Sequence, residues 1–194
     1  MRRWQPGCSA RSSRRGGGSP PPPGSAWCAD NGCFGKKGYP GDGPFLAWLA
    51  RFADPGRCAF AVAPDVPLDM AATLGRSVPV MSRIRSAGFP VALAAQNGIG
   101  DLDIPWDLFD VLFLGGDTPW KLGPEARAVT AEALRRGKLV HMGRVNSLRR
   151  LRYASAIGCS SADGTFLAFG PVIRLPELIS WVREVNSQGA LFTV

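Results

Sequence analysis

Three aspartates in this sequence stand directly after short apolar runs, at positions 30, 65 and 163. Asp163 follows residues 157–162 and comes shortly after a very basic segment, so we take it as a candidate nucleophile. Two carboxylates about 5 Å apart can cleave a glycosidic bond with retention: one attacks the anomeric carbon and the other transfers protons. Asp30 and Asp65 are the acids with which Asp163 could divide this work.

A glutamine and a pair of glycines end two further apolar runs, at Gln96 and at Gly115-Gly116. Glutamine and a carboxylate can together match the donors and acceptors of a purine-like base, and glycine lets a ligand approach the backbone closely. For a single Asp or Gly after a strand, ordinary turn formation is the competing interpretation. Because polar residues or glycines end one apolar run after another along the chain, we favour one shared site for a polar planar ligand.

A basic segment separates the apolar run 139–142 from Asp163. We predict a helix at residues 147–156, with Asn146 or Ser147 as its N-cap. Its arginines could hold the phosphates that flank a reacting nucleotide, and such contacts weaken with salt. Since Leu148 and Leu151 give this helix a buried side, a merely solvated basic face is an equally weighted alternative. The arginines concerned are Arg144, Arg149, Arg150 and Arg152.

Composition indicates one globular domain with an anionic partner. The chain has 194 residues, of which 45% are hydrophobic and 20% charged, enough for one domain with a real core. The formal net charge of +8 makes nucleic acid the first candidate partner. Residues 1–25 are rich in Arg, Ser, Gly and Pro, which predicts a disordered tail before a domain at 26–194. No apolar run approaches the length of a membrane span, so no membrane partner is expected.

The cysteines and the single histidine give weaker signals. The five cysteines fit no zinc spacing, so we expect no metal site and instead reduced thiols in a cytoplasmic protein. His141 could act as a general base. Because it stands at a strand end beside Met142, a packed or hydrogen-bonded structural histidine is the favoured interpretation.

The elements that must position these residues alternate along the chain. Strands are predicted to end at Asp30, Asp65, Gln96, Gly116, Met142 and Asp163. Helices are predicted at residues 45–52, 68–87 with an interruption at Pro79, 124–136, 147–156 and 175–185, and a turn at Asp117. Near-continuous apolar strands that alternate with helices are typical of a parallel sheet covered by helices. In a barrel of this kind the carboxyl ends of the strands share the face that holds the active site.

The order of these motifs is similar to that of a known family. The chain carries Asp30-Asn31-Gly32, Ala63-Pro64-Asp65, Gln96-Asn97-Gly98, Leu114-Gly115-Gly116, His141-Met142-Gly143 and Gly158-Cys159-Ser160-Ser161-Ala162-Asp163. This series resembles the tRNA-guanine transglycosylase family. It looks more like the compact phage and actinobacterial transglycosylase-like proteins that place 7-deazapurines in DNA. The resemblance spans residues 26 to 190.

The resemblance implies a (β/α)8 barrel that exchanges guanine for a 7-deazapurine through a covalent aspartyl-ribosyl intermediate. Asp163 would then be the nucleophile at the ribose C1′ and Asp30 the general acid/base. The base would be bound by Asp65, Gln96 and Gly116, with Gly115 alongside. No cofactor is implied, and the implied partners are the 7-deazapurine and a nucleic acid, with DNA favoured and tRNA the alternative.

The chain also departs from the family pattern. Ser160 stands where the family has an acid, the family's zinc site is absent, and its first two strands have no evident counterpart. About six β-α units do not close an eight-stranded barrel. We therefore expect an incomplete TIM-barrel-like fold that is open or is completed by a partner or a second copy. The alternatives to a transferase are a non-catalytic nucleic-acid-binding accessory protein and an unrelated hydrolase of small nucleosides.

Overall fold

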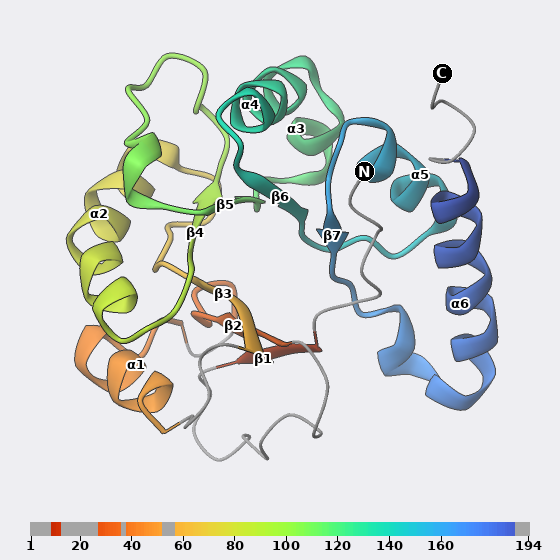
Figure 1. Cartoon of the computed structure of the whole chain (residues 1–194), viewed down its shortest axis with the longest axis horizontal. Coiled ribbons are helices and arrows are strands. Elements are labelled where there is room, and N and C mark those ends of the chain that lie inside the picture. Colours follow the sequence, from red (N-terminus) through yellow and green to blue (C-terminus); the bar gives the residue numbers. More distant parts are fainter. Residues whose placement is uncertain (1–8, 13–26, 36–37, 52–56, 189–194) are drawn as a thin grey trace.

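A single parallel sheet organises the molecule. The computed structural model describes residues 9–12, 27–35, 38–51 and 57–188. Within them, seven strands lie side by side in the order of the sequence, and every neighbouring pair is parallel. The sheet curls into an open half-barrel with helices on its outer side (Figure 1). The strands are β1 (Ser9–Ser12), β2 (Trp27–Asp30), β3 (Cys58–Val62), β4 (Val91–Ala95), β5 (Val111–Leu114), β6 (Leu139–Met142) and β7 (Ser161–Ala162). The predicted incomplete parallel β/α fold is thus confirmed.

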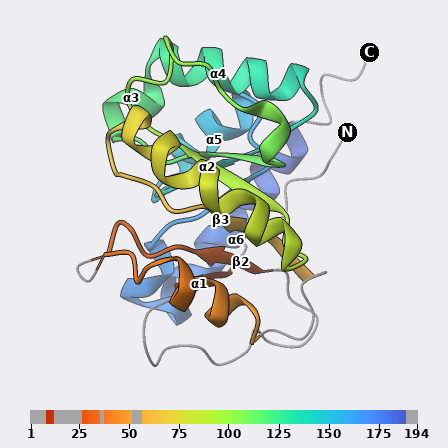
Figure 2. The same cartoon turned by 90° about the vertical axis from the view of Figure 1, so that its left-hand side faces the viewer.

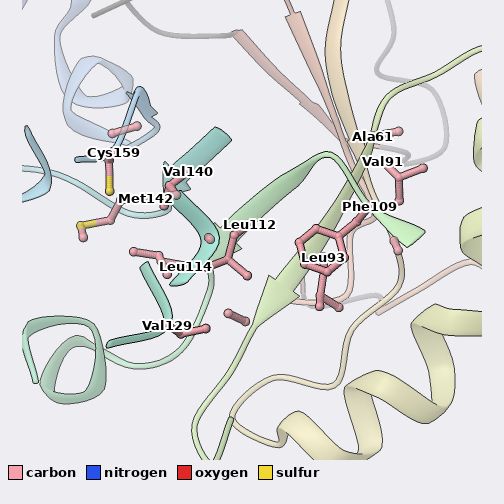
Figure 3. Packing of buried hydrophobic residues seen from close by; sticks show 14 of the residues in the cluster. Ala61, Val91, Leu93, Phe109, Leu112, Leu114, Val129, Val140, Met142 and Cys159 are labelled. Atoms are coloured by element: carbon pink, nitrogen blue, oxygen red, sulfur yellow. The ribbon is translucent and has the colours of Figure 1, made fainter. Parts of the chain in front are cut away.

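Both faces of the sheet are apolar, which explains the near-continuous apolar runs. Alternate strand residues such as Ala61, Leu93 and Leu112 belong to the large core cluster on one face (Figure 3). Their neighbours Phe60, Ala92 and Val111 form a smaller cluster on the other face. Because strand side chains alternate between the two faces, a polar residue directly after a strand continues one of these two rows.

In the part of the chain that the structure describes, six α-helices cover the sheet and connect its strands. They are α1 (Asp42–Leu49), α2 (Met70–Ser86), α3 (Thr118–Leu122), α4 (Pro124–Arg135), α5 (Leu148–Ala156) and α6 (Pro171–Gln188), and the 3-10 turns η2 (Trp106–Leu108) and η3 (Phe166–Phe169) lie between them. Figure 2 shows α1 and α2 in front of β2 and β3. Ser147 caps α5 and accepts a hydrogen bond from the backbone N–H of Arg150, as one of the two predicted caps. None of the helices in the described part of the chain is long and apolar enough to span a membrane.

Several elements differ from the sequence prediction. Helix α2 continues through Pro79, which lies on its exposed side, where water can hydrate the carbonyl that the proline leaves unpaired. The predicted turn at Asp117 is the N-cap of α3, since the Asp117 side chain accepts a hydrogen bond from the backbone of Trp120 at 2.8 Å. The predicted strand 157–162 shrinks to Ser161–Ala162 because Gly158, at φ 95°, turns the chain after α5.

The two ends of the chain also differ from expectation. Ser9–Ser12 lies within the segment predicted to be disordered, yet it forms β1 and pairs with β2. The rest of residues 1–25 lies outside the described residues, as does Phe52 at the end of the first predicted helix. Helix α6 begins before the predicted residue 175 and continues through Pro176, which lies on an exposed side of the helix, where water can hydrate the carbonyl that the proline leaves without its helical partner.

Candidate active site

The strand order brings the predicted site residues to one edge of the sheet. Asp30 is the last residue of β2, Gln96 follows β4, Gly115 follows β5, and Asp163 follows β7. Asp65 lies three residues beyond the end of β3. Because the strands are parallel, all these positions belong to the carboxyl edge of the half-barrel.

Asn31, Asp65 and Gln96 form what we call the amide–carboxylate network. Gln96 Nε2 donates to Asp65 Oδ2 at 2.6 Å, and Asn31 Nδ2 donates to Asp65 Oδ1 at 2.8 Å. The far end of Gln96 is also held, since its Oε1 accepts from the backbone N–H of Leu68 at 3.0 Å. All three side chains are at most 7% exposed. The network therefore holds two predicted base-binding residues in one fixed arrangement.

Gly115 and Gly116 are required by packing at this edge. A Cβ on Gly115 would lie 2.8 Å from Gln96 Nε2, and a Cβ on Gly116 would lie 2.4 Å from the Trp120 ring. Both backbone N–H groups donate to the carbonyl of Ala95, at 2.9 and 3.1 Å. Any larger residue would displace Gln96 or Trp120, so the glycine pair keeps the amide–carboxylate network in place.

Arg144 connects several of the loops at this edge. Its Nη2 donates to the carbonyls of Gly115 and Gly116, at 2.6 and 2.5 Å. Its guanidinium carbon lies 4.5 Å from the centroid of the Phe34 ring, in the loop after β2. Its backbone N–H donates to Asp163 Oδ1 at 2.8 Å. Arg144 thus joins the ends of β2, β5, β6 and β7, and its guanidinium is bound to the protein's own carbonyls.

Asp163 is a partly exposed carboxylate that is held from the backbone side. Its side chain is 28% exposed. Its own N–H donates to the carbonyl of Met142 at 3.2 Å. Burial raises the pKa of Asp163, but His141, the N–H of Arg144 and the charge of Lys121 lower it more, so the net pKa lies below the usual value. Asp163 therefore carries a negative charge at neutral pH, as a nucleophilic carboxylate must.

His141 lies directly beside Asp163, on the inner face of β6. The ring is fully buried, stacked on Phe113 with 4.8 Å between centroids and edge-on to Phe60 at 5.1 Å. Nδ1 lies 2.8 Å from Ser161 Oγ, and Nε2 lies 3.7 Å from Asp163 Oδ1. These contacts agree with the packed, hydrogen-bonded histidine that the sequence favoured, and they place it in reach of the candidate nucleophile.

Lys121 is a residue of this edge that the sequence reasoning missed. It is 4% exposed, and its Nζ donates to the carbonyl of Gly143 at 2.6 Å. Burial, followed by the charges of Arg144 and Arg150, lowers the pKa of Lys121 to about 8, although the charges of Asp163 and Asp117 act to raise it. The only sequence signal was the capping Asp117 four residues earlier, which we interpreted as a turn.

The remaining arginines and Asp30 have separate environments. Arg149 is exposed on α5, and Arg150 Nη1 lies 3.5 Å from the carbonyl of Arg144. Arg152 Nε contacts Glu184 Oε1 of α6 at 2.5 Å, so it ties two helices together. Asp30 Oδ1 accepts from the backbone N–H of Gly32 at 3.0 Å. Four strands separate β2 from β7 in the sheet, so only the curl of the half-barrel can bring Asp30 and Asp163 closer together.

Neither a metal site nor a matching known protein indicates what this protein does. No group of three or more His, Cys, Asp or Glu side chains in the described part of the chain could hold a metal ion. Comparison with known proteins found no family model and no curated protein that matches this sequence. A functional assignment must therefore start from the carboxyl edge itself and from the ionised carboxylate of Asp163.

Proposed function

We propose that this protein is a base-exchange glycosyltransferase that replaces guanine in nucleic acid with a 7-deazapurine. The observation that carries the proposal is Asp163, an ionised and partly exposed carboxylate at the carboxyl edge of a parallel β/α sheet. Its Oδ1 is held by the backbone N–H of Arg144, so we assign the attack to Oδ2. The order of motifs along the chain, which resembles the transglycosylases, supports the same reaction.

The reaction runs in two displacements at one carbon. Asp163 Oδ2 attacks the ribose C1′ as the bond from C1′ to guanine N9 breaks, and the departing base takes the electron pair and a proton from Asp30. The 7-deazapurine then loses its N9 proton to the Asp30 carboxylate and attacks C1′, which releases Asp163. Two inversions give net retention at C1′. Asp30 returns to its starting protonation state, so no cofactor is consumed.

The base is bound by the amide–carboxylate network and by the backbone at Gly115 and Gly116. A carboxylate offers about four lone-pair positions, and the hydrogen bonds from Asn31 and Gln96 occupy two of them. The remaining positions on Asp65 can accept from the N–H groups of a guanine-like edge. Because Asp65 and Gln96 are already oriented, the base loses little binding energy to side-chain ordering.

The nucleic acid reaches this edge with its target base unstacked, since C1′ of a stacked nucleotide is inaccessible. The exposed Arg149 and the neighbouring Arg150 on α5 are positioned to bind the flanking phosphates. We favour DNA as the substrate, with tRNA as the alternative. A second copy or a partner would complete the half-barrel beyond β7. We place the protein in the cytoplasm, which agrees with free thiols at Cys33 and Cys159.

A non-catalytic nucleic-acid-binding protein is the second candidate function. Two observations favour it: Asp65 and Gln96 bind each other, and Ser160, which replaces an acid of the family motif, is bonded to the carbonyl of Val140 at 3.1 Å. In this case the basic face of α5 would bind nucleic acid and no base would be released.

One assay separates the two functions. The protein is incubated with guanine-labelled DNA or tRNA in the presence of a 7-deazapurine, and released guanine is measured. Release from one substrate is expected, with loss in Asp163→Ala and no change in Asp107→Ala, an exposed acid before the opposite end of β5. Binding without release would identify the second function. Release that survives Asp163→Ala would reject the mechanism.

A further inference from the structure

One buried atom in the described part of the chain lacks a partner, and it lies next to the candidate nucleophile. This atom is Nε2 of His141, the only fully buried side-chain nitrogen or oxygen there without a hydrogen bond. A buried polar group without a hydrogen bond costs about 1–3 kcal/mol. Phe60 and Phe113 pack against the imidazole ring and hold its orientation. The direction in which Nε2 points is therefore a fixed feature of the site.

The atom in front of Nε2 is Asp163 Oδ1, at 3.7 Å. This distance exceeds that of a hydrogen bond. Hydrogen bonds of catalytic groups are often long in the ligand-free state and shorten when the substrate is bound. The backbone on both sides of Asp163 is held by hydrogen bonds, but a small rotation of its partly exposed carboxylate is enough to close the gap.

The strand pairing explains why both imidazole nitrogens face β7. His141 pairs directly with Ser161 across the two strands. Ser161 and Asp163 are two residues apart, so their side chains leave the same face of β7. Ser161 Oγ lies 2.8 Å from Nδ1, and its hydroxyl can rotate to donate to this nitrogen. With Nδ1 as the acceptor, the proton of the neutral ring lies on Nε2 and points at the carboxylate.

We infer that His141 positions the nucleophile: its Nε2–H binds Asp163 Oδ1, and together with the N–H of Arg144 it turns Oδ2 toward the ribose. This role rests on the proposed function, in which Asp163 attacks C1′. The carboxylate can rotate when only one donor holds Oδ1, whereas two donors on the same oxygen fix its plane. The imidazole does so without transferring its proton, so Asp163 stays anionic until it attacks.

The first test is spectroscopic and requires no enzymatic activity. His141 is the only histidine in the chain, so its imidazole signals need no separate assignment. Long-range ¹H–¹⁵N NMR spectra of the whole protein then report one imidazole ring. We expect a proton on Nε2, and a change of the Nε2 signal in Asp163→Asn but not in Asp107→Asn. A ring that is protonated only on Nδ1, or an Nε2 signal that ignores Asp163→Asn, would overturn the inference.

The second test measures guanine release by two variants. His141→Phe keeps a flat ring between Phe60 and Phe113 but has no donor, whereas His141→Gln keeps an N–H donor near the position of Nε2. Misplacement of a reacting group can cost about 10²-fold in rate, so we expect a fall of about 10²-fold in kcat with an unchanged KM for the base in His141→Phe. His141→Gln should recover about tenfold.

The outcomes of the kinetic test are distinguishable from simple loss of folding. Thermal unfolding of both variants is measured alongside, and Ser161→Ala serves as a variant that frees Nδ1 but keeps the imidazole. Equal loss of kcat in His141→Phe and His141→Gln, or full kcat in His141→Phe, would reject the positioning role. Absence of guanine release from the unaltered protein would reject the proposed function, while the NMR spectra still decide whether His141 donates to Asp163.

Discussion

The two halves of the carboxyl edge are built on opposite principles. At the ends of β2 to β4, the amide–carboxylate network pairs each polar group with a neighbour and excludes water. At the ends of β5 to β7, Lys121 is buried at the expense of its charge, His141 has an unpaired nitrogen, and Asp163 is exposed to solvent. In the first half the polar side chains hold one another in place, whereas in the second half several are left unpaired or open to solvent. Substitutions should therefore separate stability from activity between the two halves.

The largest effect is expected for activity at Asp163. Asp163→Asn keeps an oxygen that can accept from the N–H of Arg144 but removes the negative charge needed to attack C1′. We expect base exchange to fall by at least about 10³-fold, because loss of a nucleophile removes the covalent route. The free energy of unfolding should change by less than about 1 kcal/mol. A stability loss as large as that of the next variant would contradict the comparison.

The largest loss of stability is expected at Asp65. Asp65→Ala leaves the buried amides of Asn31 and Gln96 without their common acceptor, and each unsatisfied group costs about 1–3 kcal/mol. Urea unfolding should therefore show a loss of about 3 kcal/mol. Asp163→Ala, which removes an acid of the exposed half, is the matched control and should lose much less. Equal losses of the free energy of unfolding in Asp65→Ala and Asp163→Ala would show that the two halves of the carboxyl edge are equally rigid.

An effect of similar size, which depends on pH, is expected at Lys121. The pKa of Lys121 is about 8 in the folded protein, below the value of about 10.4 in an unfolded chain, so between these pH values the unfolded chain binds more protons. The free energy of unfolding of the unaltered protein therefore rises with pH in this window. Relative to that of Lys121→Met, the rise is about 3 kcal/mol. Urea unfolding of both proteins at pH 7 to 10.5 measures the difference. If the difference in the free energy of unfolding between the two proteins stays constant with pH, the pKa of Lys121 is not lowered in the folded protein.

The smallest effect concerns nucleic-acid binding by α5. Replacement of Arg149 and Arg150 by alanine should weaken binding and reduce the slope of log K against log salt by about 2, since each phosphate contact contributes about 0.9 to the slope for duplex DNA. Arg152→Ala is the control, because this side chain binds Glu184. An unchanged slope in the double variant would show that Arg149 and Arg150 only form a solvated face.

Sequence reasoning recovered the strands and their polar ends, because an apolar run that is buried on both faces is a strong signal. It placed Asp65 and Gln96 at one site, but it did not predict the hydrogen bond between them or the contact of Asn31 with Asp65. Asp65 and Gln96 are 31 positions apart, and only the pairing of β3 with β4 brings them together. Lys121 was missed because a capping Asp117 and a turn look alike in sequence. The roles of Asp163 and Asp30 in catalysis stay predictions.

The strand order has a consequence for biosynthesis. Each strand pairs with the one that precedes it in the chain, so the sheet can be extended one unit at a time as the polypeptide leaves the ribosome. The amide–carboxylate network is then complete once Gln96 has emerged, whereas Asp163 arrives with the last strand. A ribosome-bound chain that stops before β7 would thus carry the complete amide–carboxylate network without the carboxylate of Asp163.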